Sequence, residues 1–576
     1  MEKPQEIDAI IVGAGFAGLY MLHKLRGLGF SAKVIEAASD VGGTWFHNRY
    51  PGARCDIESF EYSFSFDEDL QQEWEWSERY ATQPEILRYA QHVAERFDLR
   101  RDIRFDTRIE SAFWNEGESR WDVATSDGAR FSAQYFITGV GCLSTFNRPD
   151  IRGLDDFAGE TYATGHWPHE GVDFKGKKVA VLGTGSSAIQ STPIIAQQAE
   201  TLTIFQRTPN YVVPAQNHPN DPEFIAGLKA RYAEFRKAER ESLLGAARIL
   251  PQTRKFVWDI PEDEFQAEME ERWQMGGLVG FMISHLDSGT DIKANERVAE
   301  FVRAKIRERV DDPETAELLT PRSYPITTKR LCVDIGYYEM FNRDNVELVD
   351  LNATPIERIE PGGVRTSGAF YEADILVLAT GFDAMTGALV RIDIRGKGGE
   401  KLRDKWVDGP HTHIGLMSVG FPNMFMITGP QSPSVGSNMI VSIEQHVEWI
   451  ADAMVHLRER GATTFEPLAD SEKVWGEHVD ELFNMSLHPQ ADTWYLGANV
   501  PGKPRVFTVY LGGGQCLSQH MRRDRREGLS RLRDRRRRQA ERCRFREPRR
   551  AADARGVVTG HGRLNSRQIG YYNPKR

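Results

Sequence analysis

Two stretches of the chain share one order of apolar and polar positions. In the first, an apolar run at residues 9–12 precedes glycines, an amphipathic run to Leu28 and a second apolar run that ends at Glu36. In the second, residues 179–182 precede the same sequence of features, which ends at Arg207. Short apolar runs bounded by glycine are typical of buried strands, and longer periodic runs of helices. Each stretch therefore predicts a strand, a tight turn, a helix and a second strand.

The turn of each unit carries a glycine pattern that suits a dinucleotide. The first glycine makes the tight turn, the second lets the backbone approach a pyrophosphate, and a small third residue lets the helix pack on the strand. The N-terminus of the helix then offers free N–H groups to the phosphates. One such pattern is weak evidence, but two copies, each between a strand and a helix, are specific. The positions are Gly13, Gly15 and Gly18 in the first unit and Gly183, Gly185 and Ala188 in the second.

The two units differ in the charge at the end of the second strand. Glu36 lies 23 residues after Gly13, and Arg207 lies 24 residues after Gly183. This position meets the adenosine ribose. A carboxylate accepts hydrogen bonds from ribose hydroxyls and repels a 2′-phosphate, whereas an arginine attracts that phosphate. We therefore expect FAD in the first unit and NADPH in the second, the alternative for Arg207 being a solvated strand end.

The rest of the pattern predicts how these units are completed. Residues 221–250 and 294–310 read as helices, residues 371–384 return to a strand followed by Gly381, and residues 421–450 supply a last strand, a turn and a long helix. The fold class is thus α/β, with two Rossmann-like dinucleotide-binding domains and a helical insertion. The predicted segments are 1–142 and 383–514 for a discontinuous FAD-binding domain, 143–208 and 329–382 for the NADPH-binding domain, 209–328 for the insertion and 515–576 for a tail.

The charge of the chain is unevenly distributed. The net charge is −10, yet residues 515–576 hold 20 Lys or Arg against 6 Asp or Glu. This tail lacks an apolar stripe, so we predict that it is disordered. A basic tail suits nucleic acid, but this one has few aromatic residues and none of the patterning of the body, and we expect no nucleic-acid partner. A solvated tail and a terminus altered by a shift of reading frame are the alternatives.

Other compositional features narrow the setting. No apolar run reaches the roughly 18 to 20 residues that cross a bilayer, so we expect no membrane partner. The five cysteines are scattered and form neither a paired framework nor a CxxC, which favours a reducing cytoplasm. The sequence contains no metal-binding spacing, no GxSxG and no CxxxxC after the first glycine motif. Flavin and nicotinamide must then carry the chemistry.

Several motifs extend the picture beyond the two glycine turns. They include DVGGTWFHNRYPGARCDIES, FAGETYATGHWP, QRTPN, TTKRLCVDIGYYEMFNRDNVELVD, LVLATGFDA, GPQSPS and TWYLGANVPGKPRVF. With these motifs, the chain from about Ile7 to Gly513 resembles the FAD-dependent, NADPH-using Baeyer–Villiger monooxygenases, especially those that act on aryl and bulky ketones, such as phenylacetone and steroid monooxygenases. One position departs from the pattern, because Ala163 stands where the family fingerprint has a histidine.

The resemblance implies a reaction and its residues. An oxygen atom of O₂ is inserted next to a ketone carbonyl through a C4a-peroxyflavin, which gives an ester or lactone. Arg330 would stabilise the anionic intermediates and Asp56 would hold Arg330. The FAD contacts would be Gly13, Gly15, Gly18, Glu36, Gly43, Thr44, Trp45, Asp56, Tyr62 and Met439. The NADP contacts would be Arg54, Gly183, Thr184, Gly185, Ser186, Ser187, Ala188, Gln190, Arg207, Thr208, Lys329, Arg330 and Trp494.

Two other functions remain open from the sequence. The chain could oxidise a heteroatom, or turn NADPH over to peroxide without an organic product. From a different class, it could be a non-catalytic NADPH-binding flavoprotein whose basic tail engages an acidic partner. Ester formation from a ketone separates the first reading from these two.

Overall fold

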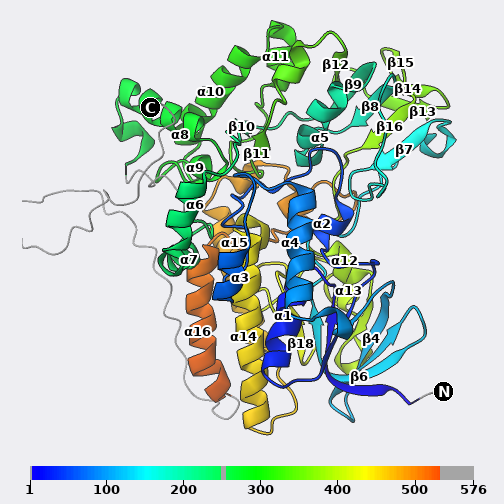
Figure 1. The fold of residues 1–576 in the computed structure, drawn as a ribbon, viewed down its shortest axis with the longest axis vertical. Coiled ribbons are helices and arrows are strands. Elements are labelled where there is room, and N and C mark those ends of the chain that lie inside the picture. Colours follow the sequence, from blue (N-terminus) through cyan, green and yellow to red (C-terminus); the bar gives the residue numbers. More distant parts are fainter. Residues whose placement is uncertain (1–2, 248–254, 532–576) are drawn as a thin grey trace, which may run out of the picture. The chain divides into compact units, whose positions relative to one another are not determined.

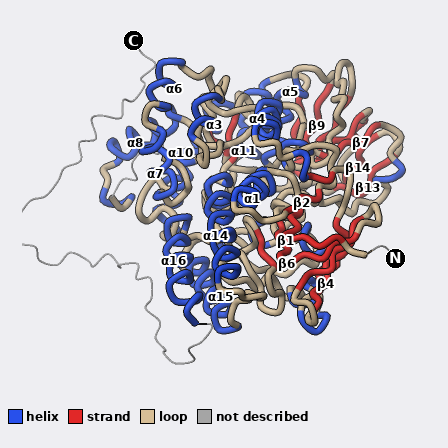
Figure 2. Tube along the Cα trace, turned by 60° about the horizontal axis from the view of Figure 1, so that its bottom comes forward, coloured by secondary structure: helices blue, strands red, loops and turns tan. Residues whose placement is uncertain are grey.

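The computed structural model describes residues 3–247 and 255–531. The chain up to Arg525 forms one compact unit. Its strands fall into two groups, one around β1 and β6 and the other around β7 and β9 (Figures 1 and 2). The described residues of the second unit, 526–531, are helical.

The first sheet has the strand order β17-β4-β5-β6-β1-β2-β3, and β18 also pairs with β6. The pairs β3–β2, β2–β1, β1–β6 and β6–β18 are parallel. Strands β4, β5 and β6 form an antiparallel meander. The bounds are β1 (Gln5–Val12), β2 (Ala32–Ile35), β3 (Ile103–Arg104), β4 (Ile109–Asn115), β5 (Arg120–Thr125), β6 (Arg130–Thr138), β17 (Asp393–Arg395) and β18 (Met424–Met426).

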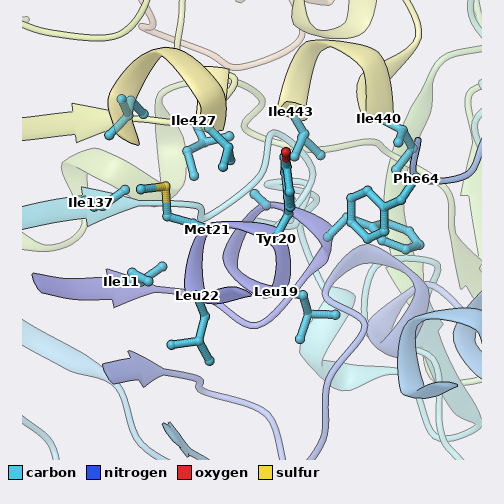
Figure 3. Packing of buried hydrophobic residues seen from close by; sticks show 14 of the residues in the cluster. Ile11, Leu19, Tyr20, Met21, Leu22, Phe64, Ile137, Ile427, Ile440 and Ile443 are labelled. Atoms are coloured by element: carbon cyan, nitrogen blue, oxygen red, sulfur yellow. The ribbon is translucent and has the colours of Figure 1, made fainter. Parts of the chain in front are cut away.

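Helix α1 (Phe16–Gly27) is buried between this sheet and helix α14 (Met439–Glu459) (Figure 3). Leu19, Met21 and Leu22 are fully buried in α1, whose first two turns are apolar, whereas the last turn carries Lys24 and Arg26. Met21 points toward Ile137 at the end of β6 (Figure 3). The core therefore holds the first glycine turn, which connects β1 to α1, in a fixed position.

The second sheet is entirely parallel, in the order β12-β9-β8-β16-β7. Its helix α5 (Ser186–Ala196) follows the second glycine turn, so both predicted strand–turn–helix–strand units are confirmed. A three-stranded antiparallel sheet, which the sequence reading missed, packs on it through Ile359 and Val364. The bounds are β7 (Glu160–Ala163), β8 (Lys178–Leu182), β9 (Thr201–Gln206), β12 (Val346–Asp350), β13 (Ile356–Glu360), β14 (Gly363–Thr366), β15 (Phe370–Glu372) and β16 (Ile375–Leu378).

The segment predicted as a helical insertion is mainly helical between residues 222 and 319. It also supplies β10 (Val212–Pro214), which pairs in parallel with β11 (Cys332–Asp334), and β11 begins two residues after Arg330. Residues 242–247, predicted as helix, are irregular and mostly bends. The helices are α6 (Pro222–Lys229), α7 (Tyr232–Glu241), α8 (Glu262–Met275), α9 (Val279–Met282), α10 (Ile292–Arg309) and α11 (Pro313–Leu319).

The remaining helices belong to the segments predicted for the FAD-binding domain. They are α2 (Thr44–His47), α3 (Glu68–Glu73), α4 (Gln83–Arg96), α12 (Gly387–Val390), α13 (Leu402–Lys405) and α15 (Ala469–Asn484). Every strand of the first sheet lies within residues 1–142 or 383–514, and every strand of the second within 143–208 or 329–382. The domain boundaries themselves stay a prediction.

The prediction of a disordered tail from residue 515 is wrong for its first part. Helix α16 spans Gly513–Arg531, and its part up to Arg525 lies beside α14, where Gln445 Nε2 donates to the carbonyl of Gly514 at 2.9 Å (Figure 1). Leu517 and Met521 are buried in the main core. Two apolar side chains four residues apart are enough to dock one helical face, and the count of basic residues hid this signal. Residues 532–576 lie outside the described part of the chain.

Replacing Leu517 with alanine will test this docking. The side chain is fully buried, so its truncation will destabilise the fold by about 2–5 kcal/mol. The midpoint of thermal release of the bound flavin will fall by several degrees. Gln519 is exposed on the same helix, and Gln519→Ala will leave the midpoint unchanged. Equal midpoints for both variants would show that α16 does not contribute to stability.

Candidate functional site

The two glycine turns have geometries that exclude side chains. Gly13 has a φ of 95°, and a Cβ there would lie 2.8 Å from the carbonyl oxygen of Gly139. Gly183 has a φ of 110°, and its Cβ would lie 2.6 Å from the carbonyl oxygen of Ala379. Real Cβ atoms do not approach oxygen this closely, and the positive φ disfavours any other residue. Both turns are therefore built as the dinucleotide pattern predicts.

A second loop closes over the first turn. Gly43 precedes α2, which begins at Thr44, and a Cβ on Gly43 would lie 3.0 Å from the Cα of Gly15. Gly15 is the N-cap of α1, and a Cβ on Gly18 would overlap the carbonyl of Gly13. The start of α1 therefore faces bare backbone, which leaves N–H groups accessible. This cradle fits a pyrophosphate.

Glu36 stands at the end of β2 beside this cradle. Its carboxylate is 5% exposed and accepts hydrogen bonds from the backbone N–H groups of Ala14 and Ala38. Burial raises the pKa of Glu36, and these hydrogen bonds oppose the rise. The carboxylate is thus fixed to the glycine turn with acceptor capacity left over, which fits ribose hydroxyls.

The second unit repeats the arrangement without an acid. Gly185 is the N-cap of α5, which begins with Ser186 and Ser187, and Ala188 is fully buried against the strands. The hydroxyl of Thr184 donates to the carbonyl of Thr208 at 2.9 Å and ties the turn to the end of β9. The helix N-terminus fits a second pyrophosphate.

Two cations lie close together at the end of β9. Burial lowers the pKa of Lys329, and the positive charge of Arg207 lowers it further, while Asp492 raises it. The ammonium group of Lys329 lies 4.3 Å from the centroid of the Tyr324 ring. Within the described residues, neither Arg207 nor Lys329 forms an ion pair with a carboxylate. Two adjacent, unneutralised cations fit a phosphate.

Arg330 follows Lys329 and points to a different partner. Its Nε and Nη2 donate to the two carboxylate oxygens of Asp56 at 2.6 and 2.7 Å, and its Nη1 donates to the carbonyl of Val435 at 2.6 Å. Burial lowers the pKa of Arg330, but Asp56 raises it more, so the net pKa lies above its usual value. The guanidinium is therefore charged and held in one orientation by three hydrogen bonds.

The charges of the Arg330–Asp56 pair act on residues at both nucleotide cradles. The pKa of Cys332 is raised to about 12 by burial and by Asp56, while Arg330 and a hydrogen bond with Ser186 at the start of α5 lower it. At the first cradle, burial raises the pKa of Tyr62 and Asp56 adds to the rise. Tyr62 in turn accepts a hydrogen bond from Trp45 Nε1 of α2 at 3.2 Å. The pair is therefore linked electrostatically to residues of both cradles.

Arg54 and Gln190 link the two units directly. Gln190 Nε2 donates to the carbonyl of Arg54 at 3.1 Å, and the hydroxyl of Tyr50 donates to Gln190 Oε1 at 2.9 Å. The Nε of Arg54 is buried without a hydrogen-bond partner. A buried donor without a partner is consistent with the NADP contact that the resemblance implies for Arg54.

Three other predicted positions are less directly connected. Met439 begins α14, with the hydroxyl of Ser434 3.7 Å from its sulfur. Trp494 packs on its neighbour Tyr495, with ring centroids 4.4 Å apart. Ala163 ends β7, and the nearby His166 faces His47 of α2 with ring centroids 6.4 Å apart.

Sequence reasoning missed two residues beside Arg330. Val435 supplies the carbonyl oxygen that accepts a hydrogen bond from Arg330. The pKa of Tyr495 is raised to about 12 because the effect of burial exceeds the opposing effect of Arg330. Their only sequence signal is proximity to the motifs GPQSPS and TWYLGANV. A main-chain acceptor leaves no trace in residue type, so Val435 could be found only in the folded chain.

Cavities and metals do not change this picture. A cavity of about 290 Å³ lies between residues 383–410 and the loop 497–508, but neither Arg330 nor Asp56 lines it. Among residues 3–247 and 255–531, no group of three or more His, Cys, Asp or Glu side chains is arranged to hold a metal ion. None of the described helices is both long and apolar enough to cross a membrane.

Two dinucleotide cradles, one suited to FAD and one to NADPH, define a flavin- and nicotinamide-dependent oxidoreductase. A family described as pyridine nucleotide-disulphide oxidoreductase matches residues 10–222. The chain is 42% identical over 511 residues to a Baeyer–Villiger monooxygenase of Pseudooceanicola batsensis, which covers 88% of this chain and 92% of the relative. It is 38% identical to a phenazine N-monooxygenase of Lysobacter antibioticus over 88% of this chain and 93% of that protein.

Solved structures agree with these relatives. An oxidized steroid monooxygenase bound to NADP is 49% identical, with a TM-score of 0.87 over 91% of this chain and 98% of that one. OTEMO in complex with FAD and NADP is 37% identical, with a TM-score of 0.87 over 92% and 99%. The chain belongs to the Baeyer–Villiger monooxygenases, which are FAD-containing, NADPH-dependent enzymes.

Proposed function

We propose that this chain inserts one oxygen atom of O₂ next to the carbonyl of an aryl or otherwise bulky ketone, at a site whose positive charge is Arg330. The observation that supports this assignment is the two hydrogen bonds from Arg330 to Asp56, a pair whose charges act on residues at both glycine turns. The likeness to a steroid monooxygenase at 49% identity supports a bulky ketone. The product is an ester or, from a cyclic ketone, a lactone.

The proposed work of the protein is electrostatic. Bound FAD and NADPH supply the redox chemistry with O₂. Arg330 offers a fixed positive charge to the negative charge that develops as a ketone carbonyl is attacked, and such preorganised charge is a major source of catalysis. Asp56 keeps the guanidinium oriented, and the carbonyl of Val435 accepts its third hydrogen bond. Arg207 and Lys329 would anchor the 2′-phosphate of NADPH and so select it over NADH.

The direct test is the product. Purified FAD-loaded protein will be given NADPH, air and a panel containing a small cyclic ketone, an aryl ketone and a steroid ketone, with esters and lactones measured by mass spectrometry. We expect esters to form, with the highest kcat/KM for an aryl or steroid ketone. Peroxide released in proportion to NADPH without any ester would contradict the proposal. Preference for the small ketone would contradict only the substrate class.

Heteroatom oxidation is the second candidate, favoured by the likeness to a phenazine N-monooxygenase at 38% identity. A panel of tertiary amines and sulfides under the same conditions separates the two functions. Faster turnover of these compounds than of every ketone would make heteroatom oxidation the principal activity. A partner-binding flavoprotein would give no organic product from either panel.

The setting of the enzyme is also a proposal. The cysteines at positions 55, 142, 332 and 516 are free thiols in the structure, and three of them are buried. Unpaired thiols are typical of a reducing compartment, which supports the cytoplasm. The substrates we propose are a small-molecule ketone and O₂, without nucleic acid or membrane.

A further inference from the structure

A second cavity, of about 350 Å³, is lined by residues of the segments predicted for both the FAD-binding and the NADPH-binding domains. It is formed by α4 and the segment around residues 168–171, together with Arg49, which follows α2. All of its ionisable lining side chains are basic. The lining residues are Arg49, Gln83, Pro84, Leu87, Arg88, Gln91, Pro168, His169 and Gly171.

The arginines of this cavity lack acidic partners. Arg49 uses Nε and Nη2 on the carbonyl of Phe46, and burial lowers its pKa, since no carboxylate offsets the loss of water. Arg88 is exposed on α4, and within the described residues neither Arg49 nor Arg88 forms an ion pair. On the same helix, by contrast, Arg96 is paired with both Asp67 and Glu73. The two cavity arginines therefore have N–H donors that no carboxylate of the described residues engages.

The third basic group is His169. Its ring lies 4.8 Å from the ring of Phe46, the same ring over which Arg49 stacks at 5.1 Å. Phe46 thus keeps the Arg49 guanidinium and the His169 ring on one wall. The charge of Glu170, the adjacent residue, raises the pKa of His169, but burial and Arg49 lower it more.

The carboxylates nearest to α4 are already committed. Asp40 accepts from Gln91 Nε2 at 2.9 Å, but it also forms an ion pair with Arg100 at 2.6 Å. Glu85, on α4, is buried and accepts hydrogen bonds from Ser77. Glu170 lies beside His169 in the sequence but does not line the cavity, so no carboxylate is among the lining residues.

We propose that this cavity binds a small multivalent oxyanion, one that carries phosphate or carboxylate groups. Its size suits a compact ligand of this class, and two arginines with free donors and a histidine suit oxyanions through charge-assisted hydrogen bonds. The site is separate from the proposed phosphate site of NADPH, because neither Arg207 nor Lys329 lines the cavity. Its ligand would act from outside both nucleotide cradles.

The cavity wall is joined to the flavin cradle by two contacts. Gln83 Nε2 donates a hydrogen bond to the carbonyl of Trp45 in α2. Leu87 packs so closely on Gly42 that a Cβ there would lie 2.5 Å from its side chain. Gly42 and Trp45 flank Gly43 and Thr44, which belong to the loop that closes over the first glycine turn. An anion that orders this end of α4 will therefore alter the surroundings of the bound flavin.

The test uses FAD-loaded protein saturated with NADP⁺, so that both nucleotide cradles are filled. Inorganic pyrophosphate and citrate will be titrated by calorimetry at constant ionic strength, while the visible spectrum of the flavin is followed. We expect saturable binding of one equivalent and a change in the flavin spectrum with the same midpoint. Absence of binding for both probes at millimolar concentration would overturn the proposal.

Two charge reversals decide where the probe binds. Arg88→Glu will weaken binding at least about tenfold, since it replaces an attractive charge with a repulsive one. Arg130→Glu is the control, because Arg130 is an exposed arginine of β6 that does not line the cavity, and it will leave affinity within about twofold. Equal loss in both variants would overturn the proposal by showing attraction to net charge alone. His169→Ala, expected to weaken binding without changing flavin content, provides the second lining variant.

Discussion

Replacing Arg330 with alanine is expected to leave the flavin reducible by NADPH, while the rate of ester formation falls about a hundredfold to a thousandfold or more. Loss of a single preorganised hydrogen-bond donor from a site of developing negative charge costs about 10²–10³ in rate, and Arg330 contributes a full charge as well. Flavin reduction requires only that NADPH and FAD lie in their cradles. The measurement is stopped-flow reduction of the flavin without oxygen, followed by the yield of ester per NADPH in air.

A companion variant and a measurement of stability make this result interpretable. Removing Arg330 leaves the carboxylate of Asp56 without its partner; both side chains are 20% exposed, so the loss of stability should be smaller than the roughly 3–5 kcal/mol of a fully buried pair. Flavin content and thermal midpoint must therefore be measured for each variant. Arg330→Lys retains the charge but loses the two-pronged geometry, and we expect an intermediate ester yield. An alanine variant that forms ester at the wild-type yield would refute the role of Arg330.

Replacing Arg207 with alanine is expected to raise the KM for NADPH by about tenfold to a hundredfold, while that for NADH changes by less than about threefold. The reason is that only NADPH carries the 2′-phosphate that Arg207 and Lys329 are placed to neutralise. The ratio of kcat/KM for the two cofactors is the measurement, because it cancels general damage to the cradle.

A matched change of charge serves as the control for this prediction. Lys177 is exposed just before β8, and Lys177→Ala removes one positive charge from the same sheet without touching the end of β9. We expect its cofactor preference to equal that of the wild type. A proportional loss of NADPH and NADH in Arg207→Ala would mean that this arginine supports the cradle and does not read the phosphate.

Local features of the nucleotide sites were predictable from the sequence. Gly13 and Gly183 could be assigned because their turns demand a positive φ and close backbone contacts that only glycine tolerates. Glu36 and Arg207 could be assigned because spacing fixes which residue stands at the end of a parallel strand. These are properties of thirty consecutive residues, so the local order of the chain carries them.

Other features depended on contacts between distant segments. The three-stranded sheet of β13, β14 and β15 was missed because its short strands gain their stability by packing on another sheet. Helix α16 was misjudged because Leu517 becomes informative only when α14 covers it. The roles of Arg330 and Asp56 came from resemblance, since an arginine and an aspartate 274 positions apart carry no joint signal in the sequence.

The sequence by itself determined that the chain has two dinucleotide-binding units and that a flavin and a nicotinamide carry its redox chemistry, and it predicts which nucleotide each unit prefers. The tertiary structure alone decided where the charge of Arg330 points, that Val435 and Tyr495 lie beside it, and that an uncompensated basic cavity stands behind the flavin loop. The physical reason is that backbone conformation follows from neighbouring residues, whereas the orientation of a charge depends on partners that only folding brings within a few ångströms.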